Sequence, residues 1–153
     1  KELLKTWRTL GVEAEVALLP RDELLKESIV PHDYDVLIFG IAMGSDPDVF
    51  AYWHSSQRGE GDRNLSEYKS ARADEALEAG RTRLDPALRA AKYQAFSTAW
   101  LEDVPAVALY RTSLNYVQSR NVIGFQTRRI IDPADRFNNV EDWAVTSSEA
   151  VRK

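Results

Sequence analysis

Residues 34–57 read YDVLIFGIAMGSDPDVFAYWHSSQ, and this stretch decides how the chain is interpreted. The apolar run over 34–40 contains β-branched residues, ends at Gly40 and predicts a buried strand. A glycine-containing turn follows, and a helix carrying Trp53 is expected after it. The turn lies at the carboxyl end of a predicted strand, which is where open α/β sheets bind ligands.

The segment before this stretch adds a helix, a strand and a helix. Apolar residues at helical spacing predict a helix over the first ten residues, which Gly11 would end. Residues 12–19 (VEAEVALL) alternate as a strand does, and a short helix over 22–28 (DELLKES) precedes Pro31. Strand, helix and strand within roughly thirty residues predict a right-handed βαβ unit with parallel strands.

The second half of the chain predicts two longer helices and further strands. Ser70 is the expected N-cap of a helix over 71–84, and Asp85-Pro86 begins a helix that runs to about Glu102. Residues 106–119 contain two short strand patterns, AVALYR and LNYVQS. The buried stripe of the second helix is expected to comprise Leu88, Ala91, Tyr93, Phe96, Ala99 and Trp100.

Composition narrows the class of protein. The 153 residues suit a single domain, and 44% hydrophobic with 29% charged residues is the ordinary composition of a globular protein. A net charge of −4 argues against a nucleic-acid partner, which favours a clustered basic face. The chain begins inside a helical pattern and without Met, so we expect a fragment of a longer protein.

Two aspartates and a histidine in the central stretch are candidates for a metal or acid–base site. Asp46 and Asp48 are two residues apart, and on an extended backbone their carboxylates point to opposite sides. A calcium loop needs more oxygen ligands and a closing Glu, which this stretch lacks. We therefore favour a turn and helix cap for these aspartates. A hydrolase or metal enzyme that uses Asp46, Asp48 and His54 is the alternative.

Nucleophilic catalysis has weaker support. His54 precedes Ser55 and Ser56, but adjacent residues on a helix do not face one another, so no triad is expected. We interpret His54 as a partly buried hydrogen-bonding group.

Tyr52, Trp53 and Tyr68 follow predicted strands on loops and could form a ligand-facing wall, whereas most other aromatic residues should belong to the core. Asn64 could face a ligand cleft or belong to the scaffold. Arg89 and Tyr93, one helical turn apart, are expected to belong to the scaffold.

Seven stretches in order along the chain resemble those of one family. They are ELLKTWRTLGVEAEV (2–16), HDYDVLIFG (32–40), DPDVFAYWHSSQ (46–57), NLSEYKSARADEAL (64–77), DPALRAAKYQAF (85–96), EDVPAVALYRTSLNYVQSRNVIGF (102–125) and FNNVEDWAV (137–145). This order is similar to the carboxy-terminal lobe of family 5 extracellular solute-binding proteins, the oligopeptide-, dipeptide- and nickel-type receptors of ABC importers.

The resemblance implies a two-lobed receptor that closes around a peptide or other small solute and delivers it to a membrane permease. It implies no catalysis, no cofactor, a monomer, and an extracytoplasmic location with a lipid anchor as one form. Residues 1–153 would be a single domain, one α/β lobe of the type II periplasmic-binding kind with a parallel-rich sheet flanked by helices. Residues from about 125 to 153 would return toward the other lobe.

The ligand-binding residues expected from this resemblance lie mostly in the central turn. They are Ile41, Ala42, Met43, Gly44, Ser45, Asp46 and Trp53. In peptide receptors of the family an aromatic residue follows the Phe-Gly pair and an Asp soon after it pairs with the peptide amino group. Here Ile41 takes the aromatic position and Met43-Gly44 stands in place of that Asp. Recognition of a peptide amino terminus is therefore not carried over, and an interaction module without solute transfer is a third hypothesis.

Overall fold

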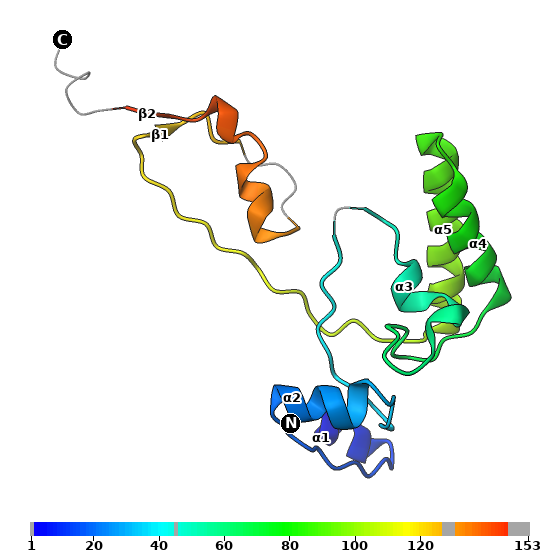
Figure 1. The fold of residues 1–153 in the computed structure, drawn as a ribbon. Helices are drawn as coiled ribbons and strands as arrows, with labels where there is room; N and C mark the ends of the chain where they lie inside the picture. Colours follow the sequence, from blue (N-terminus) through cyan, green and yellow to red (C-terminus); the bar gives the residue numbers. More distant parts are fainter. Residues whose placement is uncertain (1, 45, 127–130, 147–153) are drawn as a thin grey trace.

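The structure is a computed structural model that describes residues 2–44, 46–126 and 131–146. Figure 1 shows helices in the first two thirds of the chain and a small sheet near its end. The elements are α1 (Glu2–Thr9), α2 (Arg21–Glu23), the π-helical turn η1 (Leu24–Ile29), α3 (Phe50–Trp53), the 3-10 turn η2 (Ser55–Gln57), α4 (Ala71–Thr82), α5 (Pro86–Asp103), β1 (Val122–Ile123), η3 (Pro133–Phe137), η4 (Val140–Asp142) and β2 (Ala144–Val145).

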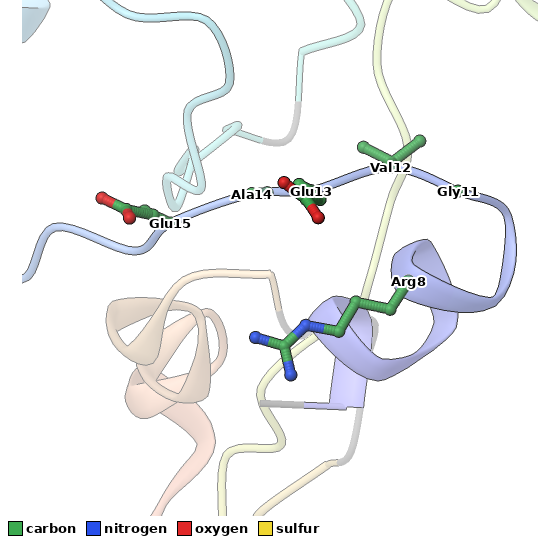
Figure 2. Close-up of a pocket in the computed structure, with 6 residues that line it drawn as sticks. All are labelled: Arg8, Gly11, Val12, Glu13, Ala14 and Glu15. Atoms are coloured by element: carbon green, nitrogen blue, oxygen red, sulfur yellow. The ribbon is translucent and has the colours of Figure 1, made fainter.

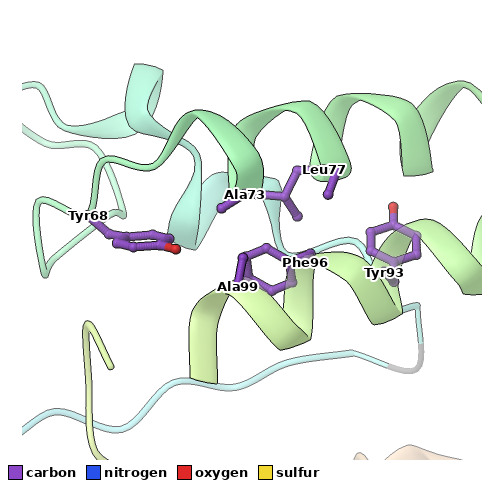
Figure 3. Packing of buried hydrophobic residues seen from close by; sticks show 7 residues of the cluster. Tyr68, Ala73, Leu77, Tyr93, Phe96 and Ala99 are labelled. Carbon is purple, nitrogen blue, oxygen red and sulfur yellow. The ribbon is translucent and has the colours of Figure 1, made fainter. Parts of the chain in front are cut away.

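The core lies between α4 and α5, which run side by side. Figure 3 shows side chains of both helices meeting at this contact, with the ring of Tyr68 at one end. Gly80 of α4 permits the close approach, because a Cβ at this position would lie 2.9 Å from Cζ of Tyr93. The buried cluster comprises Tyr68, Ala73, Ala76, Leu77, Tyr93, Phe96 and Ala99, with Val49, Phe50, Trp53 and Trp100 packed against it.

The predicted starts of α4 and α5 are confirmed, whereas the cap of α4 and the buried face of α5 differ from the prediction. Asp85 caps α5, since its Oδ1 accepts a hydrogen bond of 2.8 Å from the backbone N–H of Leu88. Ser70 occupies the N-cap of α4 but makes no side-chain cap hydrogen bond. The predicted stripe of α5 was wrong at Leu88, which is 58% exposed, and at Ala91. These positions face away from α4, and no other element covers them in the described chain.

The helices predicted near the amino terminus are also present. α1 ends as expected at a glycine in the left-handed region, because Gly11 has φ +79°. The second predicted helix forms as α2 continued by η1 and ends before Pro31. No helix among the described residues is both long and apolar enough to cross a membrane.

The predicted strands are the main difference between expectation and structure. Residues 12–19, 34–40 and 106–119 form no β-ladder, so the expected βαβ unit is absent from the described residues. The physical reason is that a helix satisfies its own backbone groups, whereas a strand needs a neighbouring strand as hydrogen-bond partner. The parallel-rich sheet stays a prediction, as does the assignment of 1–153 to one domain.

These extended segments leave apolar side chains uncovered. Large exposed fractions occur at Leu18 (91%), Ile38 (64%), Val107 (72%) and Val117 (91%). The accessible surface is 12465 Å², whereas a compact monomer of 17.3 kDa is expected to expose about 7,800 Å². The chain thus presents far more surface than a closed globule, and the segments whose sequence predicts strands contribute uncovered apolar side chains to it.

The carboxy-terminal part forms a small unit around the two-stranded sheet. β1 and β2 pair antiparallel, with Val122 opposite Val145 and Ile123 opposite Ala144. Gly124 has φ +86°, and a Cβ there would lie 2.1 Å from the Asp142 carbonyl oxygen, so only glycine fits. The expected return of residues 125–153 toward another lobe stays a prediction, and 127–130 and 147–153 lie outside the described residues.

Candidate functional site

An apolar cavity of about 340 Å³ adjoins the central turn. Its walls come from the end of the α2–η1 helix, the end of the predicted strand 34–40 with the chain that follows it, one residue of α3 and the loop before α4. The lining residues are Leu25, Ile29, Val30, Phe39, Gly40, Ile41, Ala42, Tyr52, Gly61, Asp62, Arg63 and Leu65. Segments far apart in the sequence therefore meet here, which is the usual construction of a small-molecule site.

Hydrogen bonds hold the walls of this cavity together. The backbone N–H of Gly61 donates to the Val30 carbonyl over 2.9 Å, which ties the loop to the end of η1. The Tyr34 hydroxyl donates to the carbonyl of Leu65, and burial raises the pKa of that hydroxyl. The Tyr52 hydroxyl donates to the Ala42 carbonyl over 3.4 Å, so the helix α3 supports the turn opposite.

The structure places only some of the seven predicted ligand-binding residues at the cavity. Ile41 and Ala42 line the cavity. Met43 is 53% exposed and does not line it, nor does Gly44. Ser45 lies outside the described residues. The two remaining residues, Asp46 and Trp53, have other partners.

Those two residues make contacts within the scaffold. Asp46 Oδ1 lies 2.7 Å from Arg89 Nη2, and this hydrogen bond holds the pKa of the carboxyl below its usual value. The Trp53 ring packs edge-to-face on Trp100 with 5.2 Å between ring centroids. We therefore expect Trp53 to support the site rather than to contact the solute.

The residues of the alternative enzyme site are each engaged with a different protein group. Asp46 and Asp48 form the predicted turn and cap, because Asp46 Oδ1 accepts from Asp48 N (2.8 Å) and Asp48 Oδ1 accepts from Phe50 N (3.1 Å). Asp48 Oδ2 also lies 3.0 Å from Arg81 Nε. Within the described ranges no group of three or more His, Asp or Glu side chains is placed to hold a metal ion.

His54 is buried and hydrogen-bonded, as expected, but the expectation that it does not face the serines after it was wrong for Ser56. Its Nδ1 lies 2.8 Å from Ser56 Oγ and its Nε2 lies 3.2 Å from Glu78 Oε1. The side chains of His54 and Ser56 meet because His54 has an extended backbone and caps η2. The two residues therefore do not share an α-helix. Nδ1 also accepts from the backbone N–H of Ser56, which identifies the contact as a helix cap.

Two other candidates belong to the scaffold. Asn64 is fully buried and holds its loop together through the backbone groups of His54 and Tyr68. The predicted wall residue Tyr68 instead packs into the core, and its hydroxyl donates to Asp103 Oδ2 over 2.7 Å. Of the three aromatic wall candidates, only Tyr52 reaches the cavity.

The sequence interpretation missed the helical wall and the loop wall of the cavity. Leu25 and Ile29 are four residues apart on one face of the predicted helix, and this spacing was the available signal for the helical wall. The loop residues 61–65 carried no such signal, because their position depends on the hydrogen bonds to Val30 and Tyr34.

A second hollow, of about 650 Å³, lies between α1 and the chain that follows it. Figure 2 shows Arg8 extending from the helix beneath the segment that carries Glu13 and Glu15. All six lining residues come from one stretch, Arg8 to Glu15, and most are exposed. We place the candidate site in the smaller cavity, because several segments converge there and its surface is mainly apolar.

Comparison with known proteins gives two similarities. The chain is 24% identical over 137 residues, 89% of its length, to "Oligopeptide-binding protein AppA" of Bacillus subtilis (strain 168), of which it spans 24%. It is 35% identical over 71 residues, 45% of its length, to "Protein XP55" of Streptomyces lividans, of which it spans 13%. No protein-family model and no solved structure matches the chain. The chain is thus distantly similar, along most of its length, to about a quarter of an oligopeptide-binding protein.

Proposed function

We propose that the chain is part of the substrate-binding component of an ABC importer, which captures a peptide or similar small solute and passes it to a membrane permease. The observation that carries the proposal is the similarity to an oligopeptide-binding protein over 89% of the chain. The apolar cavity supports it, because Ile41 and Ala42 of the expected ligand-facing turn line that cavity. The protein would bind its solute without catalysing a reaction.

The uncovered extended segments support a lobe of the type II periplasmic-binding kind. Exposed apolar side chains on segments with strand-like sequence favour burial against further strands and helices. We infer that residues 12–19, 34–40 and 106–119 belong to a parallel-rich sheet that residues outside these 153 complete. The cavity would then form one wall of a cleft between two lobes, and closure of the cleft would be a hinge motion.

The chemistry of the cavity favours an apolar group of the solute. Eight of its twelve lining residues carry apolar or aromatic side chains, and the two charged ones, Asp62 and Arg63, come from a single loop. A volume of about 340 Å³ suits one large side chain with part of its backbone. The turn itself supplies backbone N–H and C=O groups, to which a peptide main chain can hydrogen-bond. We propose a peptide with a leucine- or phenylalanine-like residue as the preferred solute class.

The remaining parts of the proposal concern location and partners. A receptor of this kind works outside the cytoplasm, free in the periplasm or held at the cell surface by a lipid anchor. Its partners would be the solute and the permease, and it would act as a monomer. The net charge of −4 favours neither nucleic acid nor an anionic surface as a partner.

Calorimetry on the intact protein that carries this chain tests the proposal. The probes are tripeptides with alanine at both ends and Leu, Phe, Asp or Lys in the middle. We expect the Leu and Phe peptides to bind more tightly than the other two. We expect Ile41→Asp to weaken binding by roughly tenfold or more, because the apolar side chain of the bound peptide would cover its carboxylate without pairing it. Leu84→Asp is the matched control, since Leu84 is 99% exposed and outside the cavity.

The outcomes separate the two levels of the proposal. If none of the four peptides binds, peptide capture is refuted. If the Asp or Lys peptide binds as tightly as the Leu peptide, the apolar specificity is refuted although the receptor function stands. If Ile41→Asp and Leu84→Asp change the affinity for the Leu peptide by the same factor, the cavity is not the site.

A further inference from the structure

The Asp46-Pro47-Asp48 turn is attached to two different helices through its two carboxylates. Asp46 Oδ1 lies 2.7 Å from Nη2 of Arg89 in α5, and Asp48 Oδ2 lies 3.0 Å from Nε of Arg81 in α4. Each carboxylate also accepts a backbone N–H of its own segment. One short turn is therefore connected to both helices of the core pair.

Each arginine is oriented by an aromatic ring as well. The guanidinium carbon of Arg89 lies 5.0 Å from the ring centroid of Tyr93, and that of Arg81 lies 4.4 Å from that of Phe50. Arg89 Nη2 also donates to the Tyr93 hydroxyl over 3.4 Å. The rings limit the orientations that the guanidinium groups adopt, so the two carboxylates are held in defined places.

These ion pairs are partly exposed, and this limits what they contribute to overall stability. The side-chain exposures are 29% for Arg89 and 63% for Asp46, and 49% for Arg81 and 30% for Asp48. Exposed ion pairs contribute little to the free energy of unfolding, since solvent screens them. Their principal effect should be on where the turn lies rather than on whether the protein folds.

In the sequence, the Asp46-Pro47-Asp48 turn lies between two residues that line the cavity. Ala42 is four residues before Asp46, and Tyr52 is four residues after Asp48. Both line the cavity, and the Tyr52 hydroxyl donates to the Ala42 carbonyl. A displacement of the turn would therefore move one wall relative to the other and break this hydrogen bond.

We propose that Arg81 and Arg89 are positioning residues for the solute site, which hold the Asp46-Pro47-Asp48 turn on the α4–α5 pair and so set the separation of Ala42 and Tyr52. This inference rests on the proposed function for its role in solute binding. The mechanical part, the attachment of the turn, is independent of any solute.

The test compares Arg81→Gln, Arg89→Gln and the double variant in the intact protein. Hydrogen exchange of the backbone amides over residues 46–53 is measured without ligand, together with the melting temperature. We expect the double variant to exchange roughly fivefold faster or more over this segment, with a melting temperature within about 2 °C of the unaltered protein. Arg83→Gln is the control, because Arg83 makes no ion pair within the described ranges, and it should change neither quantity.

The second measurement is binding of the alanine–leucine–alanine tripeptide. We expect the double variant to bind it roughly fivefold more weakly than the unaltered protein. Arg89→Lys should bind it more tightly than Arg89→Gln but less tightly than the unaltered protein, because lysine keeps the charge but not the planar contact with Tyr93. Unchanged exchange over 46–53 in the double variant would refute the attachment. Faster exchange with unchanged affinity would refute the positioning role. Failure of the unaltered protein to bind this peptide would instead refute the proposed apolar specificity, and the exchange result would still stand.

Discussion

The buried side chain of Asn64 provides the sharpest test of how the loop before α4 is held. Asn64 is fully buried, and its Nδ2 donates to the carbonyls of His54 (3.0 Å) and Tyr68 (2.9 Å). Its Oδ1 accepts from the backbone N–H of Tyr68 over 3.0 Å. The substitution Asn64→Asp keeps the shape of the side chain and replaces the NH₂ donor with an oxygen. Two buried carbonyls would then face an acceptor instead of a donor.

The cost follows from the number of backbone groups left without a partner. The His54 carbonyl keeps the backbone N–H of Gln57 as a donor (3.0 Å), so in the described chain the Tyr68 carbonyl is the group left without a partner. An unsatisfied buried group of this kind costs about 1–3 kcal/mol. Desolvation would raise the pKa of the substituted carboxyl, since burial disfavours its charged form. The protonated form can donate one hydrogen bond, so the destabilisation should be smaller at acidic pH than at neutral pH. A domain is typically stable by about 5–15 kcal/mol, so the effect is large.

Urea unfolding of the intact protein measures this free energy, and hydrogen exchange over residues 54–70 locates it. We expect a loss of at least about 1 kcal/mol at neutral pH and faster exchange confined first to this loop. Asn121→Asp is the matched control, because Asn121 is exposed and its side chain makes no hydrogen bond in the described part of the chain. A loss below about 1 kcal/mol for Asn64→Asp would refute the assignment of Asn64 as the structural centre of the loop.

Three further predictions concern α4, α5 and the central turn. Replacing the N-cap in Asp85→Ala should lower the stability by about 1 kcal/mol in thermal unfolding, and an unchanged value would contradict the capping role. Gly80→Ala gains about 1 kcal/mol of helix propensity but crowds the Tyr93 ring, at a cost of about 1–3 kcal/mol, so we expect no stabilisation; a raised melting temperature would disprove the crowding. The pKa of Asp46 is lowered by the hydrogen bond from Arg89, so that interaction is present above the ordinary carboxyl pKa and is lost as pH falls through the lowered one. In Arg89→Gln the Asp46 pKa should rise toward its ordinary value, and an NMR titration showing no rise would rule out the pair in solution.

The local chemistry of the sequence predicted the helices well. The ends of α1 and α5 depend on Gly11 and Asp85, and the structure uses both as expected. The same holds for the turn at Asp46 and Asp48, whose carboxylates accept backbone N–H groups two residues ahead. Such signals need only a few neighbouring residues, because a capped helix satisfies its hydrogen bonds within its own segment.

Part of the candidate site could also be expected from the sequence. The turn after the apolar run 34–40 was predicted to face a solute, and Ile41 and Ala42 of that turn line the cavity. Asp46 was expected to join them, but it pairs with Arg89, which is 43 residues away along the chain. A contact at this separation depends on how α3 packs against α4 and α5, and no local pattern records it.

The sequence by itself determined where the chain turns and which segments become helical, since capping residues and apolar periodicity act over a few residues. Only the tertiary structure decided that loop 61–65 closes the cavity, that Trp53 packs on Trp100, and that two arginines hold the central turn. The strand predictions show the same division, because apolar alternation marks a segment suited to a sheet but does not supply its neighbour. A strand forms only where another strand provides backbone donors and acceptors, and over the described residues only β1 and β2 meet that condition.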